Sequence, residues 1–376
     1  MKICFVVPTL TGGGAERVAV TVLSALDGVR HERVLYLFSA DDGVYFDRVD
    51  PGVRVVIASR RSWVARLFQL ASFLRTERPD VVMPFLSYFI TAIAAWMAGG
   101  RARVVFNQGT PTSGFLDDPD FSWKAPIRRR LFAAMTRWFY RRADAVVVTS
   151  QGVADDLATR YGVPRAKMHV LHNPVDLDAI SSAAAAPIEM VAADGPVVVA
   201  VGRLAGVKNY PLLIEALALL SGVVEPEGSA LRTTAWILGD GPERERLEHL
   251  ARHRGVGDRV RFLGFQQNPW RFIARGDVFV LTSTYEGFGN VLIEAMACGA
   301  PVVATRSPGT TEIIEHERNG LLVEHDPQAV AGAIGRLLRD PALRSRLVDA
   351  ARQGVGHYAL PRVAERYDRL FRELAA

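Results

Sequence analysis

Short apolar runs rich in valine recur along the whole chain, and segments with the apolar spacing of a helix separate them. Near-continuous runs are typical of parallel strands covered on both faces, because an exposed face would impose alternation. The runs in the first half are Ile3–Val7, Val34–Phe38, Val53–Ile57, Val81–Met83, Arg103–Phe106, Ala145–Thr149 and Met168–Leu171. Those in the second half are Val197–Val201, Thr234–Leu238, Val260–Leu263, Val278–Leu281, Val302–Ala304 and Leu321–Val323. The pattern predicts an α/β protein with two parallel sheets.

The two sets of strands indicate two Rossmann-like domains joined by a linker. The stretch Ser181–Pro187 is low in complexity, and we interpret residues 179–187 as that linker. The first domain then comprises residues 1–178, and the second comprises residues 188–357. An amphipathic helix is predicted after the last strand, within residues 358–376.

Composition is that of a soluble globular protein, since 49% of the 376 residues are apolar and 23% are charged. Cys4 and Cys298 are too few and too far apart for a disulfide framework or a metal site, which favours a reducing cytoplasm. Lys2 leads directly into the first strand, so we expect no secretion signal. The most apolar segment, Phe85–Gly100, is shorter than the roughly 20 residues of a membrane-spanning helix and is interpreted as a buried helix.

Positive charge is concentrated in the first half of the chain. The net charge is +5, and residues 1–180 hold 23 Lys and Arg against 17 Asp and Glu. Within residues 124–142, seven cations face no acidic residue and alternate with apolar side chains. This is typical of a basic amphipathic helix at an anionic membrane surface, here the inner face of the cytoplasmic membrane. The alternative is a solvated helix packed on the core; no nucleic-acid-binding motif accompanies the segment, so we expect no nucleic-acid partner.

Two glutamates eight residues apart, Glu286 and Glu294, border a predicted ligand site in the second half. Glu286 follows a buried strand and precedes a helix, which places it at the carboxyl end of a parallel strand, where open α/β sheets bind ligands. Gly287 and Gly289 let the backbone approach a ligand, and Glu294 can hold sugar hydroxyls. The alternative is a glycine-containing turn whose carboxylate is stabilised near a helix amino end.

Two cations lie in the loop after the first strand of the second half. Arg203 and Lys208 can converge there on a diphosphate without a metal, although an isolated pair of this kind is usually solvated. The turn Gly239–Arg244 follows the next strand, with Pro242 placed for a helix start and Asp240 for a cap.

Glycines 12–14 follow the first strand of the chain and precede a helix, an arrangement that can bring a phosphate to helix N–H groups. Arg17 stands where a nicotinamide-binding fingerprint would have its third glycine, so that function is disfavoured. Asp118 and Asp120 form an Asp-x-Asp, a pattern that can hold a divalent metal. Because it falls in a turn-rich loop away from any strand end, we interpret it as a solvated loop and expect no metal.

The segment Ser283–Gly299 reads Ser-Thr-Tyr-Glu-Gly-Phe-Gly-Asn-Val-Leu-Ile-Glu-Ala-Met-Ala-Cys-Gly. It resembles the signature of the retaining glycosyltransferases of group 1, or family 4. The loop Gly13–Arg17 is similar to the Gly-Gly-Ala-Glu-Arg loop of the same family, which lies between acceptor and donor diphosphate. The resemblance covers nearly the whole chain and implies the GT-B fold, in which two Rossmann-like domains face each other across a cleft and the C-terminal helix crosses back to the first domain.

The resemblance also implies roles for individual residues. Arg203 and Lys208 would neutralise the departing diphosphate. Glu286 would hydrogen-bond the sugar hydroxyls, and Glu294 would hold the ribose. The implied donor and nucleotide contacts are Gly13, Gly14, Gly202, Gly239, Asp240, Gly241, Phe265, Gly287, Phe288, Gly289, Asn290, Val291 and Glu294, with Phe265 meeting the base through its main chain. The acceptor-side candidates are Glu16, Arg17 and Asn107, the last near a position where many relatives carry a histidine.

The implied activity is retaining transfer from a nucleotide-diphosphate sugar, without metal or cofactor, to a glycan or polyprenyl-diphosphate-linked acceptor of a cell-surface polysaccharide. The glutamate segment favours a UDP-hexose or UDP-N-acetylhexosamine, although users of GDP-mannose have similar loops. One alternative is a sugar-nucleotide 2-epimerase, which would turn over the donor with no acceptor present. The other is a sugar-nucleotide-binding protein without chemistry, which would need neither glutamate.

Overall fold

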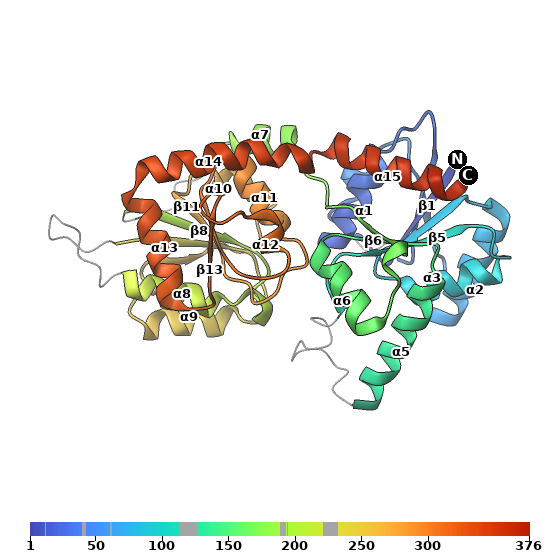
Figure 1. Cartoon of the computed structure of the whole chain (residues 1–376), viewed down its shortest axis with the longest axis horizontal. Coiled ribbons are helices and arrows are strands. Elements are labelled where there is room, and N and C mark those ends of the chain that lie inside the picture. The colour runs from blue at the N-terminus through green and yellow to red at the C-terminus, as the bar shows by residue number, and fades with distance from the viewer. Residues whose placement is uncertain are drawn as a thin grey trace. The chain divides into compact units, whose positions relative to one another are not determined.

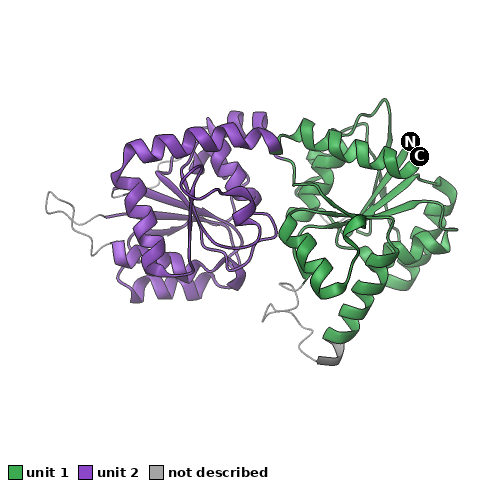
Figure 2. Ribbon diagram, in the orientation of Figure 1, with its two compact units in different colours: residues 1–174, 358–376 green, residues 175–357 purple. Residues whose placement is uncertain are grey.

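A computed structural model describes residues 1–11, 13–39, 43–60, 62–112, 126–188, 193, 195–220 and 232–376 of the chain. The chain divides into two compact units, shown in different colours in Figure 2. Unit 1 comprises Met1–Pro174 together with Tyr358–Ala376, and unit 2 comprises Val175–His357. Each unit has its own parallel sheet.

Unit 1 is built on a parallel sheet, part of which is labelled in Figure 1. The strand order is β3-β2-β1-β4-β5-β6-β7. Its strands are β1 (Lys2–Val7), β2 (Glu32–Leu37), β3 (Arg54–Ile57), β4 (Val81–Pro84), β5 (Arg103–Gln108), β6 (Ala145–Val148) and β7 (Met168–Val170). Its helices are α1 (Gly14–Ala25), α2 (Trp63–Glu77), α3 (Tyr88–Met97), α5 (Pro126–Arg142), α6 (Gln151–Tyr161) and α15 (Leu360–Ala375), with 3-10 turns η1 (Phe46–Arg48) and η2 (Arg165–Lys167).

Side chains of β1 alternate between the two faces of this sheet. Phe5 and Val7 pack in one core with side chains of α1 and α15. Cys4 and Val6 pack in the other, with side chains of α2, α3, α5 and α6. Burial on both faces explains why the strand reads as a continuous apolar run.

Helix α15 belongs to unit 1 although it is last in the sequence. Figure 1 shows it alongside α1, and the two helices are in contact. The ring of Phe371 packs edge-on against that of Phe5, with centroids 6.2 Å apart. The buried side chain of His31 bonds Asp368 through Nε2 and Oδ1, 2.5 Å apart. The predicted return of the C-terminal helix to the first domain is therefore confirmed.

Unit 2 has a parallel sheet in the order β10-β9-β8-β11-β12-β13. Its strands are β8 (Val197–Val201), β9 (Thr234–Leu238), β10 (Val260–Phe262), β11 (Val278–Leu281), β12 (Val302–Thr305) and β13 (Leu321–Val323). Its helices are α7 (Leu177–Ala184), α8 (Tyr210–Leu220), α9 (Arg244–His253), α10 (Trp270–Ile273), α11 (Asn290–Ala297), α12 (Thr310–Ile313), α13 (Pro327–Arg339) and α14 (Pro341–Val355), with the 3-10 turn η3 (Gly206–Lys208). A last 3-10 turn, η4 (Gly356–Tyr358), leads into α15.

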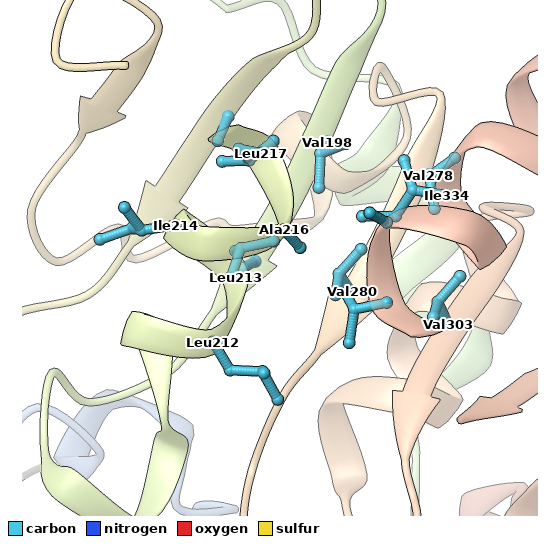
Figure 3. Close-up of a cluster of buried hydrophobic side chains, with 14 of the residues drawn as sticks. Val198, Leu212, Leu213, Ile214, Ala216, Leu217, Val278, Val280, Val303 and Ile334 are labelled. Atoms are coloured by element: carbon cyan, nitrogen blue, oxygen red, sulfur yellow. The ribbon is translucent and has the colours of Figure 1, made fainter. Parts of the chain in front are cut away.

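One core of unit 2 lies between its sheet and helices α8 and α13, as the close-up in Figure 3 shows. Val198 and Val280 come from adjacent strands, Leu213 and Leu217 from α8, and Ile334 from α13. Each is at most 1% exposed, and burying such a side chain contributes roughly 1.5–3 kcal/mol to folding. All thirteen strands predicted from the sequence are present among the described residues.

The prediction of a linker at residues 179–187 is wrong, because most of this stretch is helical. Residues 177–184 form helix α7, which belongs to unit 2 and packs on α10 and α11. Asp176 caps this helix by accepting a hydrogen bond from the amide of Ala179 at 3.0 Å. Alanine is the strongest helix former, so the alanine-rich stretch continues a helix once Ile180 has a surface to bury against.

Candidate active site

Three loops of unit 2 leave the carboxyl ends of neighbouring strands. Strands β8 and β11 are adjacent in the sheet although far apart in sequence, and the strand order reverses between them. Open α/β sheets bind ligands at such a reversal. The loop after β8 carries Arg203 and Lys208, the loop after β9 carries Asp240, and the loop after β11 carries Glu286. The topology therefore brings the predicted donor-site loops to one edge of one sheet.

Hydrogen bonds join the β8 loop to the β11 loop. The amide of Thr284 donates to the carbonyl of Val207 at 2.9 Å, and the hydroxyl of Thr282 donates to the carbonyl of Lys208 at 3.0 Å. Across this junction, Nζ of Lys208 forms an ion pair with Oε1 of Glu286. The hydroxyl of Ser283 donates to the same carboxylate oxygen at 2.7 Å.

This ion pair lies in a partly desolvated position. The side chains of Lys208 and Glu286 are 22% and 12% exposed, and Ser283 is fully buried. Nearby, Tyr210 at the start of α8 is 3% exposed and donates its hydroxyl to the carbonyl of Gly202 at 3.1 Å. Burial, and secondarily the charge of Glu286, raise the pKa of Tyr210, so its hydroxyl stays protonated and keeps donating. Charges held at fixed positions with little water interact more strongly than solvated ones.

The second predicted cation, Arg203, is exposed, and its side chain makes no hydrogen bond or ion pair within the described part of the chain. The structure thus joins Lys208 to Glu286 and leaves the Arg203 guanidinium in solvent.

The glycines of the β9 loop are required by backbone packing. Gly239 has φ +133°, and a Cβ there would lie 2.0 Å from the carbonyl oxygen of Gly202. At Gly241 a Cβ would lie 2.3 Å from the carbonyl oxygen of Leu204. The β8 and β9 loops therefore pack backbone against backbone, and a side chain at either position would push them apart.

Contacts with Gly309 and a buried side chain of its own fix the loop after β11. The amide of Gly309 donates to the carbonyl of Glu286 at 3.1 Å, and a Cβ at Gly309 would lie 2.7 Å from the Phe288 amide nitrogen. Phe288 is 2% exposed, so its side chain anchors the loop in the interior. Gly287 is buried as well, and Gly289 caps helix α11 with φ 88°. Asn290 and Val291 form the first turn of that helix and are half-buried.

Glu294 lies one turn into α11 and is 4% exposed. Its Oε2 accepts a hydrogen bond from the indole N–H of Trp270 at 2.8 Å. Cys298 lies one turn further, and burial raises the pKa of its thiol to about 12, so this thiol is not a nucleophile. Sequence reasoning missed Trp270, since nothing in the sequence couples it to Glu294. It also missed Ser283, which the spacing to Glu286 could have indicated.

Asp240 supports the neighbouring loop instead of capping a helix as predicted. Helix α9 begins after Glu243, and the Asp240 carboxylate accepts hydrogen bonds from the Phe265 amide at 2.7 Å and from Arg244 at 2.9 Å. Bonds to Glu248 and Asp240 raise the pKa of Arg244. The side chain of Phe265 is 60% exposed, and its amide already has a partner in Asp240.

The acceptor-side candidates in unit 1 have structural partners. The Glu16 carboxylate accepts from the Gly13 amide and from the Thr9 hydroxyl, each at 3.0 Å, and so closes the start of α1, whose first residue is Gly14. Asn107 is 4% exposed, and its side-chain amide donates to the hydroxyl of Tyr367 in α15 at 3.3 Å. This side chain therefore has a hydrogen-bond partner within the protein.

Arg17 lies in the first turn of α1 and is half-buried.

No group of side chains suited to hold a metal ion occurs within the described ranges. The Asp-x-Asp at residues 118–120 lies outside those ranges, as do residues 124 and 125 of the predicted basic segment.

Comparisons with known proteins agree in both halves of the chain. The sequence model described as "Glycosyl transferases group 1" matches residues 186–354, and "Glycosyltransferase Family 4" matches residues 12–179. The chain is 35% identical to the lipopolysaccharide core biosynthesis glycosyltransferase LpsE of Rhizobium meliloti over 61% of this chain, a match that spans 64% of LpsE.

One further relative and one solved structure match nearly end to end. The N-acetylgalactosamine-N,N'-diacetylbacillosaminyl-diphospho-undecaprenol 4-alpha-N-acetylgalactosaminyltransferase of Campylobacter jejuni is 29% identical over 93% of this chain and 94% of its own length. The crystal structure of Anabaena HepE in complex with UDP and glucose superposes with a TM-score of 0.78 at 23% identity, covering 99% of this chain and 100% of HepE. The fold is GT-B, and the chain belongs to the group 1, family 4 glycosyltransferases.

Proposed function

We propose that the protein is a retaining, metal-independent glycosyltransferase that takes a sugar from a nucleotide-diphosphate donor. The observation that carries this proposal is the Lys208–Glu286 ion pair, supported by Ser283, at the strand-order reversal of unit 2. A cation and a carboxylate at one sheet edge suit the two groups that the reaction must hold. The cation suits the anionic diphosphate that leaves, and the carboxylate can accept hydrogen bonds from the neutral sugar hydroxyls.

The proposed donor contacts hold different parts of the nucleotide sugar. Lys208 and the exposed Arg203 neutralise the diphosphate as it departs, with the Arg203 side chain moving from solvent onto the phosphates. Glu286 accepts hydrogen bonds from sugar hydroxyls and orients the donor. Glu294 holds the ribose hydroxyls from the first turns of α11. With two cations on the leaving group, no metal is needed.

The donor is proposed to be a UDP-sugar carrying a hexose or an N-acetylhexosamine. HepE was solved with UDP and glucose, and the Campylobacter relative is named for N-acetylgalactosaminyl transfer. The acceptor is proposed to be a glycan or polyprenyl-diphosphate-linked sugar, bound by unit 1. The names of the LpsE and Campylobacter relatives, a lipopolysaccharide core enzyme and a diphospho-undecaprenol enzyme, support an acceptor of this class.

Helix α5 of unit 1 is proposed to rest on the anionic inner face of the cytoplasmic membrane. No helix in the described part of the chain is long and apolar enough to cross a membrane. On α5, Arg130, Arg137 and Arg141 are exposed together with Leu131 and Trp138, which are 55% and 44% exposed. An exposed helix face with both cations and large apolar groups fits a lipid headgroup layer. Co-sedimentation with anionic vesicles that weakens as salt rises would support this contact, whereas equal binding to neutral vesicles would contradict it.

The test of the donor site is calorimetric titration with UDP, GDP and ADP, first in EDTA and then with magnesium. We expect one diphosphate to bind in EDTA and Glu294→Ala to abolish that binding. A requirement for magnesium would contradict the metal-free site. Incubation with the matching sugar nucleotide and no acceptor separates the alternatives, because an epimerase would convert the donor and a transferase would leave it largely intact.

A further inference from the structure

Trp270 has a contact that the proposed donor site does not yet use. It is the first residue of the one-turn helix α10, and its indole N–H reaches the Glu294 carboxylate on α11 at 2.8 Å. The thiol of Cys298, also at the end of α11, lies 3.8 Å from the Trp270 carbonyl oxygen. The contact therefore links two elements of unit 2 at the residue proposed to hold the ribose.

Helix α7 also fixes the segment that carries Trp270. The side-chain amide of Asn268 donates to the carbonyl of Ala183 at 2.8 Å, and the guanidinium of Arg275 donates to that of Ala184 at 3.1 Å. Helix α7 also packs directly on α11. The segment is therefore bonded to α7 both before and after Trp270 in the sequence. This holds the indole N–H of Trp270 at a defined position.

The chemistry of an indole suits this task. An indole N–H is a neutral donor and cannot accept a proton, so it orients a carboxylate without cancelling its charge. A carboxylate that is held but still negative is the better acceptor for a pair of sugar hydroxyls.

We infer that Trp270 is a positioning residue, which orients Glu294 toward the ribose hydroxyls of the bound nucleotide. The inference rests on the proposed function, since it assigns Glu294 to the ribose. It also gives the segment 268–275 a role in donor affinity.

Unit 2 offers a matched control in Trp236 of β9. This side chain is 5% exposed, its ring packs edge-on against Phe272 of α10, and its indole N–H has no hydrogen-bond partner among the described residues. Trp236→Phe and Trp270→Phe therefore make the same chemical change, the first in a strand packed against α10 and the second in α10 itself. Only the second removes a hydrogen bond to Glu294.

The experiment titrates UDP, GDP and ADP, and the 2′,3′-dideoxy form of whichever binds, into the wild type and the two Trp variants. Because a hydrogen bond to a charged group is lost, Trp270→Phe should weaken binding of the ribonucleotide by about fivefold. Trp236→Phe should leave it within about twofold, and Trp270→Phe should bind the dideoxy form as the wild type does.

Unchanged ribonucleotide affinity in Trp270→Phe would overturn the inference, as would equal losses for the ribonucleotide and its dideoxy form. Both results concern Trp270 alone. If the wild type bound none of the three diphosphates, or Glu294→Ala bound them normally, the proposed donor site itself would be wrong.

Discussion

Each unit contains a lysine–glutamate ion pair, and the two pairs lie at opposite ends of their sheets. In unit 1, Lys2 opens β1 and bonds Glu77 at the end of α2 at 2.8 Å. In unit 2, Lys208 follows β8 and pairs with Glu286 after β11. The residue types are the same, and the side chains of the two lysines are almost equally exposed, at 21% and 22%.

The surroundings of the two pairs differ. Glu77 also bonds Arg54, and hydrogen bonds from Arg54 and Lys2 lower its pKa to about 2. That pair is surrounded by compensating charge at the amino ends of the strands, where parallel sheets do not bind ligands. Glu286 instead has one cation and one neutral hydroxyl at the carboxyl ends. The position of an ion pair in the sheet, more than its composition, separates a stabilising contact from a site.

The largest effect is expected from Lys208→Ala, which should lower the rate of sugar transfer by about 10²–10³-fold because the leaving diphosphate loses a preorganised cation. Lys2→Ala is the counterpart in unit 1 and should leave transfer unchanged. The measurement is the release of nucleoside diphosphate with acceptor present. Equal losses in the two variants would remove the distinction between the two pairs.

The next effect concerns the backbone of the loops after β8 and β9. Gly239→Ala should destabilise the protein by about 3 kcal/mol, because the new Cβ meets the Gly202 carbonyl and the φ angle suits only glycine. Gly14→Ala in unit 1 should not destabilise it, since no described atom lies within 4 Å of a Cβ there. Urea unfolding of both variants checks this. A stable Gly239→Ala would show that the β8 and β9 loops can separate without cost.

Ser283→Ala should lower transfer by about tenfold while binding of the nucleoside diphosphate stays intact, because the variant removes one of the two donors that hold Glu286. The hydroxyl contacts the Glu286 carboxylate, which is proposed to hold the sugar, so the loss should appear in kcat. Steady-state kinetics beside calorimetry separate the two quantities. A loss of diphosphate affinity instead would assign Ser283 to the nucleotide.

The smallest effect is expected at Glu77. Its pKa is lowered from 4.5 to about 2 in the folded state, so its contribution to stability is present above about pH 4.5 and is lost as the pH falls toward 2. Glu77→Gln should therefore cost about 1 kcal/mol at pH 7, a modest value because the pair is partly exposed. The difference from the wild type should shrink between pH 4.5 and pH 2, and transfer at neutral pH should not change. Unfolding curves across this range test it; a difference that is constant with pH would contradict it.

The strands could be predicted from the sequence because parallel strands buried on both faces leave a dense apolar run, as in Val197–Val201. The predicted strand ends place Lys208 and Glu286 at the carboxyl edge of one sheet, and in the structure the two residues lie at that edge. The alanine-rich stretch could not be assigned in this way. Whether it is a linker or a helix depends on the surfaces of α10 and α11 that α7 covers, and these are known only from the tertiary structure.

Partners of the site residues were harder to predict. The indole of Trp270 reaches Glu294 only because α10 and α11 pack together, and no local pattern encodes that distance. Asn107 and Glu16 were acceptor-side candidates because of the resemblance to the family. The structure shows that Asn107 bonds Tyr367, 260 residues away, and that Glu16 closes its own helix. A polar residue chosen by resemblance therefore indicates a site only after its structural partners are known.

Helix α15 has a consequence for the order in which the protein forms. It completes the core of unit 1, where its Asp368 meets His31 across a sequence separation of 337 residues. During synthesis, unit 2 is therefore finished before unit 1 has all of its parts, and the first unit to emerge from the ribosome is the last to be complete. Until α15 arrives, the apolar face of β1 that it covers stays available to chaperones or to another chain. A stop codon just after unit 2 would consequently damage the domain made first.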